Sequence, residues 1–220
     1  MKKTAIVVHS GGMDSSICLK LAINEFGTEN VLSLSFQYNQ RHIGELTQAA
    51  IIAAHFGVDN LVLPIDCLQQ ITTNALTNKE MAIVKEEKLP PNTLVVGRNG
   101  LMARIAAIHA EELGATYIYM GIIEVEACNS GYRDCTRHYM NLMENILRID
   151  LNDPQFEIRT PLVFMTKKET MELAETLGVL DYLLEETITC YEGIRGLGCK
   201  VCPACKLRND GIELYYASLT

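Results

Sequence analysis

The chain has 220 residues, of which 48% are hydrophobic and 21% are charged, and its formal net charge is −8. This composition is typical of a globular protein with an ordinary hydrophobic core, and it excludes a disordered or fibrous chain. Binding of RNA or DNA depends on Lys and Arg that neutralise phosphates, so the acidic balance argues against a direct nucleic acid partner.

The apolar runs of the chain are short. None approaches the roughly 18 residues of a membrane-spanning helix. The first run, which follows two lysines, is too short for the core of a secretory signal. We therefore expect a cytoplasmic protein that has no membrane partner. In that reducing compartment, cysteines are expected to be buried thiols or metal ligands.

Strands and helices alternate in the first part of the chain. Apolar, β-branched runs predict strands at 4–9, 31–36, 60–66 and 115–121. Helical spacing predicts helices at 15–26, 45–57 and 101–115. The alternation predicts an α/β fold, with a doubly wound, mainly parallel sheet and helices on both faces. Ligands bind such sheets beyond the carboxyl ends of the strands, which directs attention to the loops at 10–16, 37–42, 97–99 and 121–135.

The remaining segments differ in character. Residues 67–97 are too long for an ordinary connection and predict a lid or a substrate loop. Helices are predicted in NLMENILRI and TKKETMELAETLGV, and a closing helix follows a cysteine cluster near the end. We expect residues 1–180 to form the α/β domain and residues 181–220 to form a small segment that packs as part of the same unit.

The sequence SGGMDSS at 10–16 lies between the first predicted strand and helix. Its glycines allow a close backbone approach, and serine hydroxyls and N–H groups at a helix start can bind an anion. Asp14 could hold a Mg²⁺ that bridges phosphate oxygens, although an ordinary capped turn is the alternative. SGGxDS resembles the signature of the PP-loop ATP pyrophosphatases, which implies ATP with Mg²⁺ as a co-substrate that is cleaved to AMP and pyrophosphate.

Four of the eight cysteines follow the spacing C-x8-C-x2-C-x2-C, namely Cys190, Cys199, Cys202 and Cys205. Four thiolates can form a closed tetrahedral zinc site, which is structural because it has no open position. The spacing alone leaves an iron–sulfur cluster open. The glycines and the proline between the ligands, and the helix that follows, favour a structural Zn²⁺.

The chain as a whole resembles the QueC family of 7-cyano-7-deazaguanine synthases. The resemblance rests on SGGMDSS, QYNQRH (37–42), GRN (97–99), SGYRDC (130–135), TPL with the lysine of MTKKET, and ETITCYEGIRGLGCKVCPACKLRNDG. It implies an adenine nucleotide α-hydrolase-like fold and a homodimer. It also implies a carbon–nitrogen ligase of queuosine precursor biosynthesis, which converts 7-carboxy-7-deazaguanine and ammonia to 7-cyano-7-deazaguanine through an adenylated acid and an adenylated amide.

The resemblance also assigns roles by position. The ATP-binding residues would be His9, Ser10, Gly11, Gly12, Met13, Asp14, Ser15 and Ser16. The substrate-binding residues would be Gln40, Arg41, His42, Arg98, Asn99, Ser130, Gly131, Tyr132 and Asp134. The catalytic residues would be Asp14, Lys167, Arg98, His42 and Asp134. Lys167 would neutralise the released pyrophosphate, although a solvated lysine is an equal alternative.

The predicted substrate loop, EVEACNSGYRDCTR, departs from the family pattern D-x-SGYPDCR. Glu126 is the nearest acid to the usual aspartate, Arg133 replaces a proline, and Thr136 stands where an arginine is expected. An alternative is therefore a QueC-like ligase that forms an amide or joins the acid to another amine, including one on a protein. A tRNA-modifying PP-loop enzyme and a zinc-binding module with an inactive loop are further alternatives.

Overall fold

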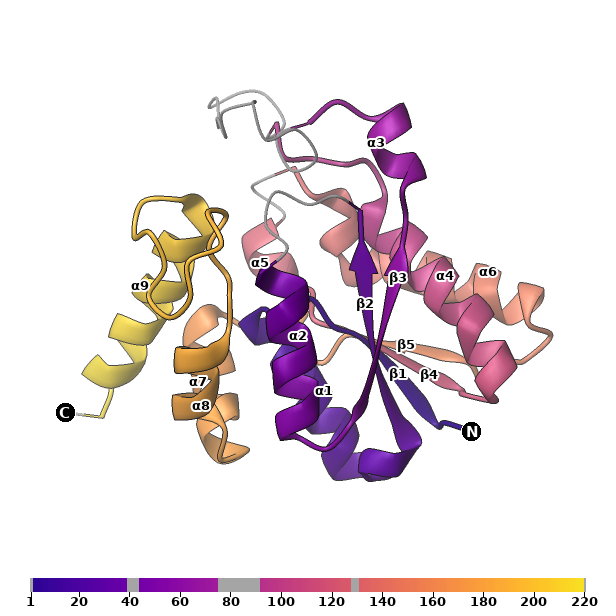
Figure 1. Cartoon of the computed structure of the whole chain (residues 1–220), viewed down its shortest axis with the longest axis horizontal. Coiled ribbons are helices and arrows are strands. Elements are labelled where there is room, and N and C mark those ends of the chain that lie inside the picture. The colour runs from indigo at the N-terminus through magenta and orange to yellow at the C-terminus, as the bar shows by residue number, and fades with distance from the viewer. Residues whose placement is uncertain (1, 39–43, 75–91, 128–130, 220) are drawn as a thin grey trace.

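The computed structural model describes residues 2–38, 44–74, 92–127 and 131–219. Its centre is a five-stranded parallel sheet in the order β3-β2-β1-β4-β5 (Figure 1). The strands are β1 (Ala5–Val8), β2 (Val31–Gln37), β3 (Asp59–Pro64), β4 (Tyr117–Met120) and β5 (Glu157–Arg159). The predicted α/β fold with a parallel sheet is confirmed.

Helices connect and cover the strands. They are α1 (Met13–Phe26), α2 (Gly44–His55), α3 (Cys67–Ile71), α4 (Arg98–Leu113), α5 (Glu124–Ala127), α6 (Arg137–Asp150), α7 (Lys167–Thr176), α8 (Leu180–Glu186) and α9 (Pro203–Ala217). Short 3₁₀ turns lie at Thr28–Asn30 and Arg133–Cys135. Among the described helices, none has both the length and the apolar character that a bilayer crossing requires.

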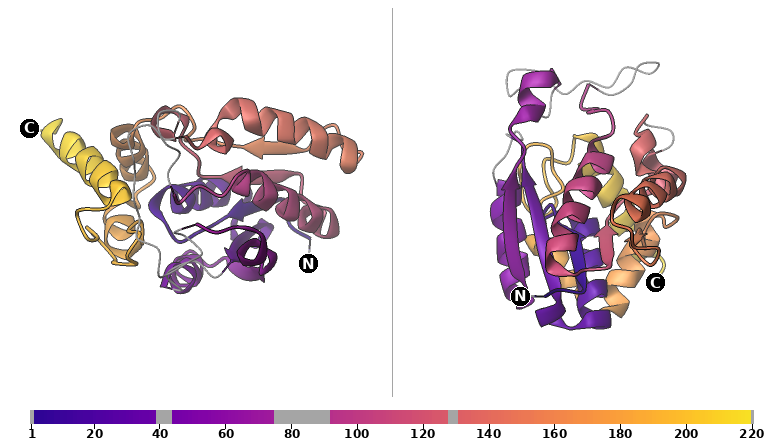
Figure 2. Two further views of the ribbon diagram at one scale, coloured as in Figure 1. Left: turned by 90° about the horizontal axis from the view of Figure 1, so that it is seen from above. Right: turned by 90° about the vertical axis from the view of Figure 1, so that its right-hand side faces the viewer.

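The strands carry apolar side chains on both faces, as expected for a sheet that is covered on both sides. Ile6 of β1 and Leu34 of β2 pack with α4 and α6 in one core cluster. Ala5 and Val7 of β1 pack with α1, α7 and α8 in the other. α9 lies beside α7 at one side of the molecule (Figure 2). The alternation of side chains along β1 thus builds both cores.

The order of the strands reverses around β1, which pairs with β2 on one side and with β4 on the other. In parallel sheets this reversal opens a crevice beyond the carboxyl ends of the strands. The loop after β1 and the residues after β4 therefore meet there. Gly121, directly after β4, lies so close to α1 that an added Cβ would be 2.7 Å from the backbone N of Ser15.

The segments outside the strongest sequence patterns were predicted less well. The sequence patterns did not predict the short helices α5 and α8. Helix α8 follows α7 after three residues. It buries Leu180 and Leu183 in the core cluster that also contains side chains of α1 and α7. Of the predicted lid at 67–97, the structure describes α3 and residues 92–97, and residues 75–91 lie outside the described part.

Candidate active site and metal-binding segment

The loop between β1 and α1 brings its polar groups together at the start of the helix. Ser10 and Ser15 share a hydrogen bond of 3.1 Å between their hydroxyls, and the Ser15 hydroxyl also donates to the Gly12 carbonyl. Gly11 has a φ of +81°, and a Cβ there would be 2.4 Å from the Glu45 carbonyl oxygen. The loop can take this path only with glycine at position 11.

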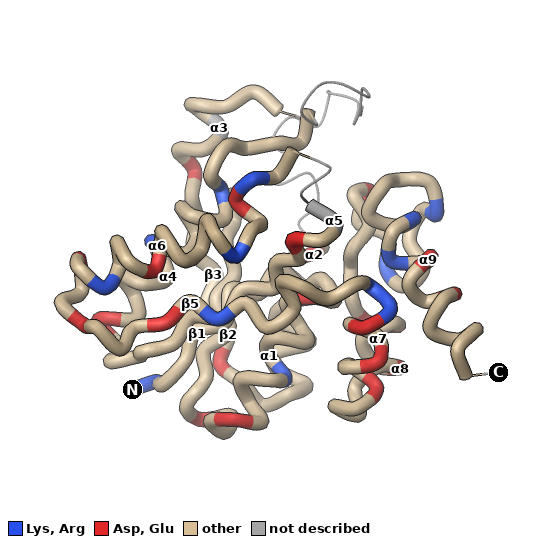
Figure 3. The backbone as a smooth tube through the Cα atoms, turned by 180° about the vertical axis from the view of Figure 1, so that it is seen from behind, with Lys and Arg blue, Asp and Glu red and all other residues tan. Residues whose placement is uncertain are grey.

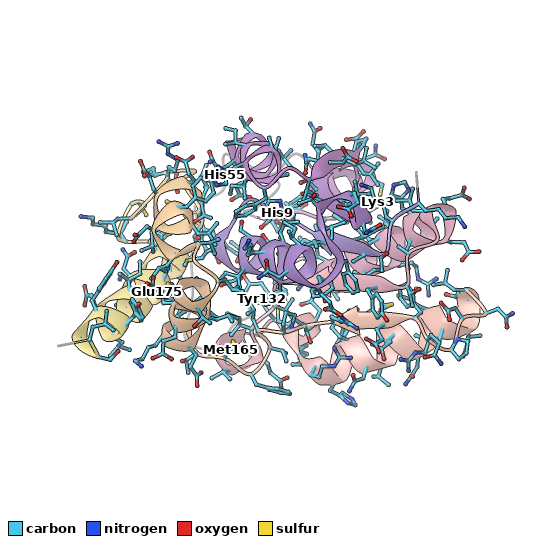
Figure 4. The ribbon with its side chains drawn as sticks, turned by 90° about the horizontal axis from the view of Figure 1, so that it is seen from below. Lys3, His9, His55, Tyr132, Met165 and Glu175 are labelled. Carbon is cyan, nitrogen blue, oxygen red and sulfur yellow. The ribbon has the colours of Figure 1, made fainter. Side chains whose placement is uncertain are left out.

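His9 and Met13, which the family resemblance assigns to ATP binding, have buried side chains. The His9 ring contacts the Ser33 hydroxyl at 2.9 Å and the Ser16 hydroxyl at 3.0 Å, and burial lowers its pKa to about 3. His9 is therefore neutral and ties the loop to β2. Figure 4 labels His9 near the middle of the molecule. The Met13 side chain packs in the core with Ile17 of α1, so only its backbone faces the loop.

Asp14 and Lys167 meet across the loop from distant parts of the chain. The Lys167 Nζ atom donates to Asp14 Oδ2 at 2.6 Å. The second oxygen, Oδ1, is buried and has no hydrogen-bond partner among the described residues. A buried carboxylate oxygen without a donor is suited to a cation, and Mg²⁺ prefers such oxygen ligands. The donor set therefore fits a magnesium ion that accompanies a phosphate group.

Lys167 is held in place by its own helix and by α9. A capping box between Thr166 and Glu169 fixes the start of α7, where Lys167 is the first residue. On the other side, Gly211 of α9 lies so close that an added Cβ would be 2.4 Å from the Lys167 Cβ. The close approach of α9 to α7 therefore depends on glycine at position 211.

Arg98 lies at the start of α4 with several of the predicted substrate residues. Its guanidinium donates to the Tyr38 hydroxyl at 3.3 Å and lies 5.6 Å from the centroid of the Tyr38 ring. The backbone N–H of Asn99 donates to Asp134 Oδ2 at 2.9 Å, so the Asp134 carboxylate is buried and caps this helix. Gly131, with a φ of +89°, precedes Tyr132, which hydrogen bonds to Thr93.

One cavity of about 550 Å³ joins these groups. It is lined by Ser10, Asp14, Ser15 and Lys167, which we call the loop group. It is also lined by Tyr38, Arg98, Asn99, Tyr132 and Tyr191, which we call the arginine group. The volume lies within the range of small-molecule sites, and the mixture of aromatic walls with a few charged groups is typical of them.

The sequence analysis assigned no role to three further residues of this cavity. Burial raises the pKa of Glu45 to about 7, and the charge of Arg98 opposes this shift. The Thr189 hydroxyl is buried and has no partner among the described residues. Tyr191 is two residues further along. Glu45 follows QYNQRH, and Thr189 and Tyr191 lie inside the motif ETITCYEGIRGLGCKVCPACKLRNDG, so these motifs were the only signal that could have pointed to them.

Some predicted residues cannot be placed. Gln40, Arg41, His42 and Ser130 lie outside the described residues, as does the side chain of Glu126. The described residues that flank them, Tyr38 and Tyr132, both line the cavity. The assignments of these five residues stay predictions.

A larger and shallower hollow of about 1220 Å³ lies along the edge strand β5. Its charged side chains already neutralise one another, since Arg137 pairs with Glu144 at 3.2 Å and Arg159 pairs with Glu25 at 2.7 Å. Surface charges that already pair with one another have little remaining attraction for a charged ligand. Size alone therefore does not make this hollow the functional site, and the cavity beside Asp14 is the stronger candidate.

The four clustered cysteines come together in residues 188–207, which we call the cysteine segment. Their sulfur atoms lie within 4.8 Å of one another, and those of Cys199 and Cys205 are 3.9 Å apart. A zinc ion with sulfurs at about 2.3 Å separates them by about 3.8 Å, so the cluster fits a single tetrahedral ion. Hydrogen bonds from the backbone N–H groups of Cys202 and Val201 lower the pKa of Cys199, which favours the thiolate.

The cysteine segment is also a wall of the cavity. The Ile188 N–H donates to the Gly11 carbonyl at 3.1 Å, which ties the segment to the loop after β1. Thr189, Tyr191, Pro203, Ala204 and Leu207 line the cavity from this side. The cysteine segment and the loop therefore both enclose the site.

Comparison with known proteins agrees with this architecture. The chain is similar to the solved structure of the NH3-dependent NAD synthetase from Campylobacter jejuni, with a TM-score of 0.53 and 14% identity over 83% of this chain and 67% of that one. At this identity the likeness concerns the fold alone. A family model described as queuosine biosynthesis protein QueC matches residues 4–216. The chain therefore belongs to the QueC family, whose PP-loop enzymes use ATP in the biosynthesis of the queuosine precursor.

Proposed function

We propose that the protein is a carbon–nitrogen ligase that converts 7-carboxy-7-deazaguanine and ammonia to 7-cyano-7-deazaguanine, with ATP cleaved to AMP and pyrophosphate. The observation that carries this proposal is the single cavity of about 550 Å³ that contains both the loop group and the arginine group. An enzyme that adenylates a carboxylate needs a phosphate site and an acid site within one enclosed space.

The loop group would hold the triphosphate. The hydroxyls of Ser10 and Ser15 and the N–H groups at the start of α1 can donate to phosphate oxygens. Asp14 would hold Mg²⁺, which supplies charge neutralisation when it is bound. Lys167, which is 11% exposed and already directed at Asp14, would stabilise the negative charge that develops on pyrophosphate.

The arginine group would hold the deazaguanine acid. Arg98 is a cation beside an aromatic ring, and it can pair with a carboxylate. Tyr132 and Tyr191 offer flat apolar surfaces to a planar base. The carboxylate oxygen attacks the α-phosphorus and pyrophosphate leaves. Ammonia then attacks the acyl carbon, AMP leaves and an amide forms after loss of a proton.

The nitrile requires a second round in the same cavity. The amide oxygen attacks the α-phosphorus of a second ATP, pyrophosphate again leaves, and the amide nitrogen loses one of its two protons. Loss of AMP together with the remaining N–H proton forms the carbon–nitrogen triple bond. No covalent bond to the protein is needed, so positioning and charge stabilisation by Asp14, Lys167 and Arg98 account for the catalytic role of the chain.

For the cysteine segment we propose a structural Zn²⁺ bound by Cys190, Cys199, Cys202 and Cys205. Four thiolates leave no open position for catalysis. The short distances between the sulfurs favour one ion over an iron–sulfur cluster, because a cluster distributes its thiolates over separate irons. Elemental analysis of the purified protein should find about one zinc per chain, and iron with inorganic sulfide would contradict this assignment.

The experiment that tests the reaction is a mass-spectrometric assay with 7-carboxy-7-deazaguanine, ammonium, Mg²⁺ and ATP. We expect a product with the mass of the nitrile and about two AMP for each product, as two adenylations require. An Asp14→Asn variant should form neither the nitrile nor AMP. Absence of pyrophosphate release by the unaltered protein would contradict the proposal.

A second candidate, a ligase that stops at the amide or uses another amine, is favoured by one observation. At the position of the expected arginine, Thr136 caps α6 and accepts from the Tyr139 N–H at 3.1 Å. The guanidinium of the following Arg137 donates to the Ile158 carbonyl at 2.6 Å, outside the cavity. The same assay separates the candidates, since accumulation of the amide, or reaction only with an added amine, would support the second.

A further inference from the structure

Arg208 of α9 has an unusual environment for a cation. It is 1% exposed and is the largest of the fully buried side chains. Its Nη2 atom donates to the Gly196 carbonyl and, at 3.4 Å, to Asn209 Oδ1. The Nε and Nη1 atoms are buried, and neither has a hydrogen-bond partner among the described residues.

A buried guanidinium with two unpaired donors and no carboxylate beside it is costly, because its charge is not compensated. Arg208 forms no ion pair with a carboxylate in the described parts of the chain. Burial lowers the pKa of Arg208, and the thiolates of Cys205, Cys190 and Cys202 oppose that shift.

Arg208 follows Cys205 by three residues on α9, and side chains at this spacing share one face of a helix. Gly198, two residues after the Gly196 acceptor, lies against the Cys205 sulfur. The negative groups beside Arg208 are therefore the sulfurs of the cysteine cluster.

The metal site in turn needs positive charge. Four thiolates around one divalent ion carry a net charge of about −2. Backbone N–H groups compensate part of it, since those of Glu192 and Cys199 donate to the Cys190 sulfur at 3.3 Å. Lys and Arg gather in this region, shown in blue near the start of α9 in Figure 3. Of these, Arg208 is the buried one, whereas Lys200 and Lys206 are exposed.

We infer that Arg208 is the counter-charge of the metal-loaded cysteine cluster, with its Nε and Nη1 groups donating to thiolate sulfurs. This accounts for a buried cation with two unused donors beside four clustered sulfurs. Hydrogen bonds and charges around the ligands commonly set the affinity of a metal site. The inference depends on the proposed metal site and is independent of the ligase reaction.

The test is a measurement of metal affinity on the full chain. The metal is removed, and Co²⁺ and Zn²⁺ are titrated in competition with a coloured chelator. Arg208→Met should weaken binding by about 10- to 100-fold, the usual effect of losing a group that supports the ligands. Arg208→Lys should lie between this variant and the unaltered protein. The matched control is Lys206→Met, which removes an exposed charge from the same helix and should change little.

A purely structural role for Arg208 predicts a different result. It would lower the thermal stability of the metal-free and metal-loaded forms by similar amounts. A counter-charge instead predicts that Arg208→Met lowers the stability of the metal-loaded form only. In the metal-free form the substitution removes a buried charge that has no counter-charge, so no stability is lost. If Arg208→Met does not fold, the metal affinity of Arg208→Lys is measured in its place. A metal affinity of Arg208→Lys equal to that of the unaltered protein would overturn the proposed donation from Nε and Nη1.

The outcomes also separate this inference from the proposals above. Equal metal affinity of Arg208→Met, Lys206→Met and the unaltered protein overturns the role of Arg208 and leaves the metal site intact. Failure of the unaltered protein to bind Co²⁺ or Zn²⁺ overturns both. The ligase assay stands apart, since it follows nucleotide and base products.

Discussion

In the cavity, the loop group and the arginine group are assembled in different ways. Three of the four members of the loop group come from one stretch, Ser10 to Ser15, and only Lys167 is distant in sequence. The arginine group draws Tyr38, Arg98, Tyr132 and Tyr191 from four separate segments. A site built on one turn tolerates changes elsewhere in the chain, whereas a site collected from several loops can change its ligand by altering any of them.

The largest effect should follow removal of the distant member of the loop group. Lys167→Met should reduce pyrophosphate release by about 100- to 1000-fold, because it removes the cation that lies 2.6 Å from Asp14 and that, in the proposed reaction, stabilises the developing charge. Lys168→Met is the matched control, since its partner is Glu172 on the same helix and it does not line the cavity. Equal activity of the two variants would show that the loop group functions without Lys167.

Glu45 makes the stability of the folded protein depend on pH. Its pKa rises on folding from about 4.5 to about 7 because the charged form is buried, so the folded state binds more protons in that range. Stability should therefore fall as the pH rises from about 4.5 to about 7 and then level off, by up to about 3 kcal/mol.

Glu45→Gln should remove this dependence. The measurement is urea unfolding of both proteins across this pH range, and the difference between the two curves isolates Glu45 from the other titrating groups. Parallel curves would contradict the buried environment of the carboxyl. Glu45 lies beside both groups of the cavity, so this experiment tests whether they share one enclosed space.

Gly211→Ala should affect the loop group from outside the cavity. The new Cβ would meet the Lys167 Cβ at 2.4 Å and the Lys167 carbonyl carbon at 3.1 Å, so α9 must move away from α7. We expect a loss of about 1–3 kcal/mol in the free energy of unfolding, as overpacking usually causes, together with reduced pyrophosphate release. Gly44→Ala is the control, because among the described residues its Cβ would meet only the Ile188 Cδ1, at 3.6 Å.

The smallest effect should come from Thr189→Val, which removes a hydroxyl and keeps the shape of the side chain. If Thr189 donates to ATP, the dissociation constant for ATP should rise by roughly tenfold, the worth of about one hydrogen bond. Thr189→Ser should retain most of the affinity. Calorimetric titration of ATP into each variant is the measurement, and unchanged affinity of Thr189→Val would restrict the ATP site to the loop group.

The contrast between the loop group and the arginine group explains which parts of the site could be predicted from the sequence. SGGMDSS is a local pattern whose glycines and serines act within one turn, so it could be recognised without knowledge of the fold. The cysteines could be recognised by their spacing. Glu45 and Thr189 could not, because their burial in the cavity arises when α2 and the cysteine segment pack beside the loop. The unpaired donors of Arg208 likewise depend on how α9 packs against residues 196–198.

The hydrogen bond between the Ile188 N–H and the Gly11 carbonyl has a consequence for folding. It joins residues that are separated by most of the chain, and contacts of such long range form late. During synthesis, the first strands and α1 leave the ribosome long before the cysteine segment does. The cavity proposed to bind ATP would thus lack one wall until residues 188–207 emerge, so ATP binding should report complete folding of the chain and not of its first half.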